Sequence, residues 1–191
     1  ATVARAAVQA GADMVNDVSG GTFDPDMLRV VAELHVPMIL MHMRGTPETM
    51  DKLTDYDDVV CDVGAALAQQ SKTAESLGIH RWLQVVDPGI GFAKDIHGNL
   101  LLLRNLASLR SATNNLPLLI GTSRKGFLGK LTGTGRPQDR DAGTIASCVA
   151  SICLERRQSE QQDCTILRVH NVSDCKQAAV VMDSILKIGF L

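Results

Sequence analysis

Short apolar runs alternate along the chain with longer segments in which apolar residues recur at helical spacing. The short runs lie at 14–16, 36–42, 83–86, 117–121 and 165–168, and each is short and apolar enough to be a buried strand. The segment 56–77 has helical periodicity and is followed by Gly78, as a helix C-terminus often is. Asp24 and Pro25 predict another helix start, and a last helix is expected after Ser173. The pattern predicts β/α units around a parallel sheet.

The number of units predicts the architecture. A helix at 1–10 precedes five strand–helix units of roughly 35 residues, whereas a closed eight-stranded barrel needs about 250 residues. We therefore expect the α/β class, with 1–191 forming the C-terminal part of a single TIM (β/α)8 barrel domain, roughly strands 4–8 and their helices. An open doubly wound sheet is the alternative, disfavoured because polar residues follow every strand instead of one switch point. The polar stretch 155–163 is expected to be a surface insertion without a function.

Composition and charge limit the classes of partner. The 191 residues are 45% hydrophobic and 21% charged, which is typical of a globular protein. A net charge of −2 creates no field that attracts a polyanion, so we expect neither nucleic acid nor an anionic membrane as a partner. No apolar run approaches the ~20 residues of a membrane span.

Cysteine usage predicts the compartment. The five cysteines are odd in number and lack CxxC spacing, which favours reduced, buried thiols over disulfides or a zinc site. They are Cys61, Cys148, Cys153, Cys164 and Cys175. We expect a reducing intracellular compartment, the cytoplasm or a mitochondrion. Because the chain begins without Met inside a predicted helix, we expect residues to precede Ala1, and any targeting signal is unreadable.

Cationic residues follow two of the predicted strands. Ser123, Arg124 and Lys125 come after the strand 117–121, at the edge where a parallel sheet binds its ligands. Two cationic heads there predict a site for an anionic substrate, and Lys125 could also neutralise charge in a transition state. Arg168 and His170 are two residues apart and share one side of their strand, which suits a diphosphate.

A carboxylate follows a third strand. Asp87 begins the string DPGIGF, whose two glycines permit a tight turn close to a flat ligand. Its two oxygens match the paired N–H groups of an amino-pyrimidine edge, although a lone Asp-Pro-Gly more often only caps its own turn. Asn16 could bind a heterocycle edge and Met41 could lie beneath a ring, unless the one is satisfied locally and the other is core.

Other polar residues have simpler explanations. His42 lies on the opposite face of its strand from Met41, so we expect it to be packed or hydrogen-bonded and do not count it as a base. A group of aspartates at the start of the helix 56–77 is expected to be solvated and to complement the helix dipole, without binding a metal. These are Asp51, Asp55, Asp57 and Asp58.

Taken together, five strings closely resemble the dihydropteroate synthases of folate biosynthesis. In chain order they are VND at 15–17, MHMRGTP at 41–47, DPGIGF at 87–92, SRKGF at 123–127 and RVH at 168–170. The resemblance implies a transferase that condenses 6-hydroxymethyl-7,8-dihydropterin diphosphate with 4-aminobenzoate, giving 7,8-dihydropteroate and diphosphate. Two alternatives stay open, a pterin-dependent methyltransferase and a non-catalytic pterin-binding remnant.

The resemblance also implies roles for individual residues. Pterin binding is implied for Asn16, Met41, Asp87, Gly121, Lys125 and Arg168. Binding of 4-aminobenzoate, at the site that sulfonamides occupy in this family, is implied for Phe92 and Ser123. The catalytic residues would be Lys125, Arg168 and His170, the last two holding the leaving diphosphate.

Cofactor and partners follow from the same resemblance. The family uses Mg²⁺, and the Asn that supports it is expected before Ala1, so we expect no metal ligand within 1–191. An Asp-Thr motif and two loops over the aminobenzoate are also expected there, so this chain alone should show little turnover. Asn171 and Gly126 suggest a eukaryote-like member. The expected partners are the two small-molecule substrates, a second copy in a homodimer, and a fused upstream hydroxymethyldihydropterin pyrophosphokinase.

Overall fold

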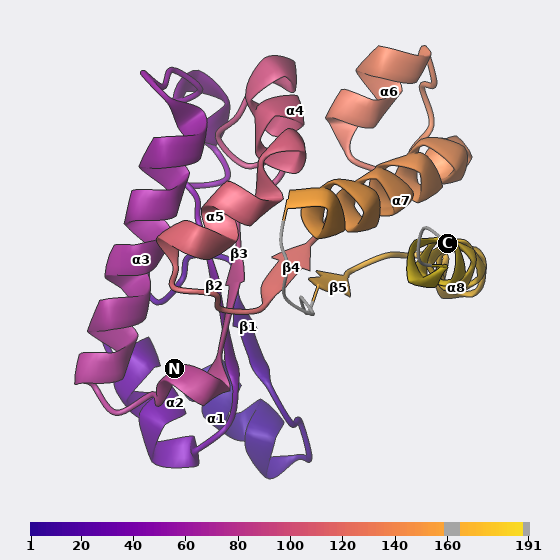
Figure 1. Ribbon diagram of the computed structural model, residues 1–191. Coiled ribbons are helices and arrows are strands. Elements are labelled where there is room, and N and C mark those ends of the chain that lie inside the picture. Colours follow the sequence, from indigo (N-terminus) through magenta and orange to yellow (C-terminus); the bar gives the residue numbers. More distant parts are fainter. Residues whose placement is uncertain (159–164, 189–191) are drawn as a thin grey trace.

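Five parallel strands form one sheet whose spatial order is the chain order. The computed structural model describes residues 1–158 and 165–188. The strands are β1 (Val15–Asp17), β2 (Met38–Met41), β3 (Gln84–Asp87), β4 (Leu118–Ile120) and β5 (Thr165–Leu167). Each strand pairs in parallel with the next, and in Figure 1 the colour runs along the sheet in sequence order. The five predicted strands are confirmed, and an order without a reversal matches the wall of a barrel.

Helices follow the strands and cover one face of the sheet. They are α1 (Thr2–Gln9), α2 (Met27–Leu34), α3 (Val59–Ser76), α4 (Ile96–Arg104), α5 (Leu106–Ala112), α6 (Gly126–Thr132), α7 (Asp141–Gln158) and α8 (Val172–Lys187). Short 3-10 turns lie at η1 (Met50–Lys52), η2 (Arg81–Leu83) and η3 (Pro137–Arg140). Within the described residues, no helix is long and apolar enough to cross a bilayer.

Strand alternation divides the core into two parts. Met38, Leu40 and Val86 pack outward with the helices in the main hydrophobic cluster. The residues between them point to the opposite face, where a separate small cluster forms, composed of Ile39, Val85, Leu119 and Ile166. In a barrel this second face is the interior. The parity of each strand therefore decides which side chains can reach an internal site.

Two helix boundaries that the sequence predicts from local signals can be compared with the structure. The Gly78 prediction is confirmed: Gly78 has φ +100°, and its N–H and that of Ile79 donate to Glu75 O and Ala74 O, closing the end of α3. The prediction of Asp24 as an N-cap is wrong, because α2 begins at Met27. The Asp24 carboxylate instead accepts the Asp26 N–H at 3.0 Å, in a turn that precedes the helix.

The expectation of buried cysteines holds for part of the set. Cys148 and Cys175 are buried, and burial raises the pKa of the Cys148 thiol to about 11. Cys61 is exposed and Cys153 is half-buried, so the expectation is wrong for Cys61. Cys164 lies outside the described residues. The described cysteines are free thiols.

The expectation of a surface insertion at 155–163 is wrong for its first residue. Glu155 lies in α7 and is 2% exposed. Its carboxylate accepts the Arg110 Nε–H at 2.7 Å and also contacts Thr165 Oγ1, linking α5, α7 and β5. A glutamate in a polar stretch is expected at the surface, but one whose carboxylate pairs with a guanidinium can be part of the protein interior. Residues 159–163 lie outside the described residues.

We expect Glu155→Ala to lower the free energy of unfolding by about 3–5 kcal/mol, because Arg110 would keep a buried charge without its main partner. Urea denaturation measures this change. The control is Glu33→Ala, which breaks the ion pair with Arg5 whose side chains are 42% and 61% exposed. That variant should lose less than about 1 kcal/mol. Equal losses in the two variants would contradict a structural role for the buried pair.

Candidate functional site

The predicted pterin residues occupy the inner face of the sheet at its carboxyl edge. Each residue of the small inner cluster is followed two positions later by a predicted site residue: Met41, Asp87, Gly121 and Arg168. Asn16 is paired in register with Ile39 and so shares this face. The period of two therefore brings all five to one side of the sheet, as the strand-end pattern predicts.

Asp87 is buried and starts a sharp turn. The residue is 6% exposed, and Oδ1 accepts the Gly89 N–H at 2.7 Å. The carboxylate thus caps its own turn, and a carboxylate has further lone pairs with which to bind a ligand. Burial raises the pKa of Asp87, while the Gly89 N–H and the nearby cations Lys125, Lys94 and Arg168 act in the opposite direction. The site is therefore a buried acid with cations on several sides.

Glycine is required within this turn. Gly89 has φ +68°, and a Cβ there would lie 1.9 Å from the carbonyl oxygen of His42. At Gly91 a Cβ would lie 2.8 Å from Lys125 Cδ. The two glycines let the β2 backbone and the Lys125 side chain approach the turn closely.

Lys125 connects the end of β4 to the turn after β3. It is the residue preceding α6, and its Nζ donates to Ile90 O and lies 4.5 Å from the centroid of the Phe92 ring. Burial lowers the pKa of Lys125 to about 8; Asp87 opposes this shift and Arg168 adds to it. The structure therefore brings Lys125, Asp87 and Phe92 together.

Ser123 and His170 form a second contact between strand ends. Ser123 Oγ lies 2.9 Å from His170 Nδ1 and also accepts the His170 backbone N–H at 3.1 Å. The Arg168 backbone N–H donates to Ile120 O at 3.0 Å, which continues the β4–β5 pairing beyond the strand, and its side chain is exposed. The Ser123 hydroxyl is thus engaged with the imidazole that the sequence assigns to diphosphate.

The expectation that both cationic heads after β4 face an anion is wrong for Arg124. Its guanidinium forms two hydrogen bonds to Asp141 of α7, at 2.8 and 2.9 Å. Arg124 has φ +60°, an unusual backbone conformation for a residue with a side chain, and its N–H donates to Thr144 Oγ1 at 3.1 Å. Arg124 anchors the loop to α7, while the adjacent Lys125 turns toward Asp87.

His42 is a packed residue, as predicted, and its partner was missed. His42 is 4% exposed, and its Nδ1 lies 3.1 Å from Lys94 Nζ. Burial and the nearby cations Lys94 and Arg44 lower the pKa of His42 to about 3, so the ring is neutral. In the sequence, Lys94 is distinguished only by its position, between the apolar residues 91–93 and the helix N-cap Asp95.

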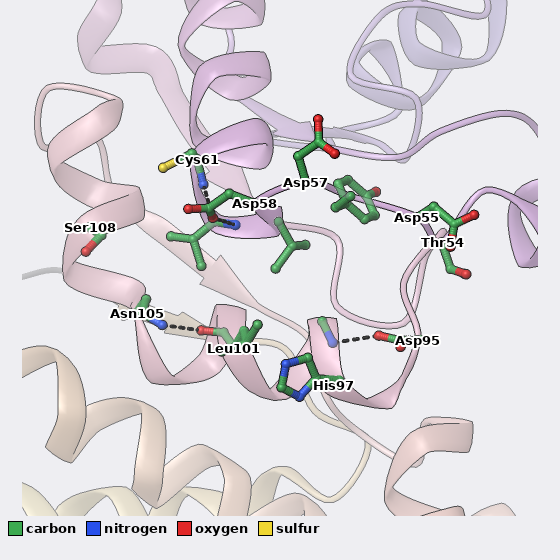
Figure 2. A pocket seen from close by; sticks show the side chains of 14 residues that line it. Thr54, Asp55, Asp57, Asp58, Cys61, Asp95, His97, Leu101, Asn105 and Ser108 are labelled. Carbon is green, nitrogen blue, oxygen red and sulfur yellow. Dashed lines mark hydrogen bonds between the residues drawn. The ribbon is translucent and has the colours of Figure 1, made fainter.

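A separate pocket of about 660 Å³ lies between the segment 54–61 and α4. None of the predicted site residues lines it. Figure 2 shows two of its aspartates bonded to helix amides: Asp58 accepts from Val60 and Cys61 at the start of α3, and Asp95 from Gly98 in α4. The predicted role of the acidic run at a helix start is confirmed for Asp58.

The described residues contain no group of three or more His, Cys, Asp or Glu side chains that could hold a metal ion. We call the carboxyl edge of the sheet, where Asp87 ends its strand and Lys125 and His170 follow theirs, the mouth. There Asp87 lies near Lys94, Lys125 and Arg168, and His170 is hydrogen-bonded to Ser123. That donor set does not fit a magnesium centre, which requires several oxygen ligands.

Comparison with known proteins agrees with this geometry. The family described as "Pterin binding enzyme" matches residues 1–170. The chain is 43% identical over 97% of its length to the dihydropteroate synthase of Synechocystis sp., and 43% identical over 97% to a protein of Arabidopsis thaliana named "Folate synthesis bifunctional protein, mitochondrial". A dihydropteroate synthase of Xanthomonas albilineans, solved with 4-aminobenzoic acid, superposes with a TM-score of 0.85 at 37% identity over 98% of this chain.

The chain spans part of each of these relatives: 61% of the Synechocystis protein, 34% of the Arabidopsis protein and 63% of the Xanthomonas chain. The likeness nonetheless extends over almost all of the chain, including the five strand ends that meet at the mouth. The chain belongs to the pterin-binding enzyme family, among the dihydropteroate synthases.

Proposed function

We propose that the protein carrying this chain condenses 6-hydroxymethyl-7,8-dihydropterin diphosphate with 4-aminobenzoate, forming 7,8-dihydropteroate and diphosphate. The observation that carries the proposal is the buried Asp87 carboxylate with the cations Lys125 and Arg168 acting on it from two other strand ends. An acid suits the amino-pyrimidine edge of a pterin, and cations suit a departing diphosphate. The Xanthomonas relative, solved with 4-aminobenzoic acid, supports the second substrate.

The residues at the strand ends then divide the tasks of binding and catalysis. Asp87 and Asn16 bind the donor and acceptor groups of the pterin edge, while Met41 and Gly121 line the ring pocket. Lys125 and Arg168 also contact the pterin, and Arg168 together with His170 holds the diphosphate. Phe92 and Ser123 lie on the aminobenzoate side. Open space beside Gly121 supports its role in lining the ring pocket, because a Cβ at this position would meet no atom within 4 Å.

The reaction requires positioning and charge stabilisation. The C–O bond between the pterin methylene and the diphosphate breaks, and its electron pair leaves with the diphosphate. The nitrogen of 4-aminobenzoate forms the new C–N bond and then loses one proton. Arg168 and His170 would stabilise the negative charge on the leaving group, and Lys125 would bind the pterin beside the reacting carbon. No protein nucleophile is needed.

Magnesium, the further partners and the compartment remain proposals. The described residues do not form a magnesium site, so no step above is assigned to the ion. A fused upstream pyrophosphokinase is supported by the name of the Arabidopsis relative, a bifunctional folate synthesis protein. The same name supports a mitochondrial location as one option, and the cytoplasm is the other. A homodimer is the remaining expected partner.

The cationic group separates this function from its alternatives. A pterin-dependent methyltransferase would need the acid at β3 but has no diphosphate to hold. Lys125 and Arg168 follow two neighbouring strands and both act on the charge of Asp87, and His170 lies two residues beyond Arg168. A pterin-binding remnant without activity would equally have no use for a cation cluster at this position. We therefore favour the synthase reaction.

We expect Asp87→Asn to weaken pterin binding by ~100-fold or more, because a carboxamide cannot accept two parallel N–H bonds as a carboxylate does. Isothermal titration calorimetry of the complete protein with a free pterin measures the change. Asp57→Asn, in the exposed acidic segment, is the matched control and should bind as the wild type does. Wild-type affinity in the Asp87 variant would remove this carboxylate from the site.

We expect Arg168→Ala to weaken the diphosphate-bearing pterin by about 10- to 100-fold and free pterin by much less, because a guanidinium pairs mainly with phosphate oxygens. Competition binding of the two ligands gives the ratio. Arg29→Ala, on the exposed side of α2, removes the same charge away from the mouth and serves as the control. Equal losses for both ligands would argue against an anion-binding role.

The pKa of Lys125 predicts a pH dependence. Because that pKa is lowered to about 8, the ammonium is present below that pH and is lost above it. Affinity for the diphosphate-bearing pterin should therefore fall by about tenfold as pH rises through the Lys125 pKa. Lys125→Arg keeps its charge and should not show this fall. Identical profiles for the two proteins between about pH 6 and about pH 9 would contradict the assignment.

A further inference from the structure

The ammonium of Lys94 is saturated inside the protein. The residue is 8% exposed, and Nζ lies 2.9 Å from Phe92 O, 3.2 Å from Gly89 O and 3.1 Å from His42 Nδ1. An ammonium has three N–H donors and no acceptor, so these three contacts use all of its hydrogen-bonding capacity. Lys94 therefore has no donor left for a ligand.

The three acceptors belong to two strand ends. Gly89 O and Phe92 O are in the turn that carries Asp87, and His42 directly follows β2. The His42 N–H in turn donates to Asp87 O at 2.9 Å, so the two strand ends are bonded at both backbone and side-chain level. Lys94 thus bonds the turn after β3 to the residue that follows β2.

Other bonds hold the same turn without contributing charge. The Gly91 N–H donates to Asn99 Oδ1 at 2.6 Å, and Tyr56 Oη donates to Ala93 O at 3.0 Å. These contacts provide a comparison, because removing one of them loosens the turn and leaves the charges near Asp87 unchanged.

Lys94 also contributes to the charge balance around Asp87. The cations that favour the ionised carboxylate are Lys125, Lys94 and Arg168, from three different segments. Burial lowers the pKa of Lys94 to about 7, with Asp87 opposing that shift and Lys125 and Arg44 adding to it; His42 beside it is neutral. While it is charged, Lys94 favours the ionised form of the Asp87 carboxylate.

We propose that Lys94 is a positioning residue for pterin recognition, which bonds the turn after β3 to the end of β2 and keeps Asp87 anionic in its buried place. The proposal rests on the proposed function, in which Asp87 binds the pterin edge. Lys94 acts through Asp87 and does not touch the ligand.

Calorimetric titration of a free pterin into the complete protein, from about pH 4 to about pH 8, tests this role. Lys94→Met keeps the length of the side chain and removes its charge and donors. We expect pterin affinity about 10- to 100-fold below wild type at neutral pH. Loss of a nearby cation raises the Asp87 pKa, so the fall in affinity on the acidic side should move to higher pH. Tyr56→Phe is the matched control, and its pterin affinity should fall at the same pH as that of the wild type when the pH is lowered.

The outcomes separate this proposal from the proposed function. Wild-type protein that binds no pterin would refute the proposed function itself. Wild-type binding together with an unshifted acidic fall in Lys94→Met would overturn the role of Lys94, even if affinity drops. If that variant does not fold, ¹⁵N NMR of the wild-type protein decides: we expect His42 neutral with its proton on Nε2, because Nδ1 accepts from Lys94. A proton on Nδ1 would overturn the proposal.

Discussion

The burial of the Asp87 carboxylate is the constraint on which the mouth of the sheet depends. Taking a carboxylate out of water costs free energy unless opposite charges and N–H donors surround it. Here those groups come from separate segments: a turn amide at Gly89, Lys94 before α4 and Lys125 before α6. The carboxylate therefore links elements that are distant in sequence, and the shape of the mouth follows from satisfying its charge.

The backbone makes this close arrangement sterically possible. The positive φ and absent side chain at Gly89 let the turn lie against the β2 backbone, and Gly91 leaves room for Lys125 to cross over it. The alternation of side chains along each strand also matters, because the residues that pack the interior and the residues that would bind the ligand share a face. Packing of the inner cluster and geometry of the site are thus set by the same alternation.

Features that depend on local pattern could be predicted from the sequence, and features that depend on a distant partner could not. The strands and the Gly78 helix end follow from apolar spacing and local backbone preference. The sequence predicts that Glu155 is at the surface, because its partner Arg110 lies 45 positions away and cannot be recognised from the local pattern. The role of Lys94 is missed for the same reason, since His42 lies 52 positions away. The direction of Arg124 depends on its positive φ and on Asp141, neither of which a strand pattern reveals.

The contact between Ser123 and His170 has a consequence for how the ring meets an anion. Ser123 Oγ contacts both the backbone N–H and the Nδ1 of His170, so one side chain holds the main chain and the ring of the histidine together. The orientation of the imidazole is therefore set when the chain folds, with Nε2 on the side of the ring away from Ser123. An oxyanion that reaches this strand end would meet a ring that is already oriented and needs little reorganisation.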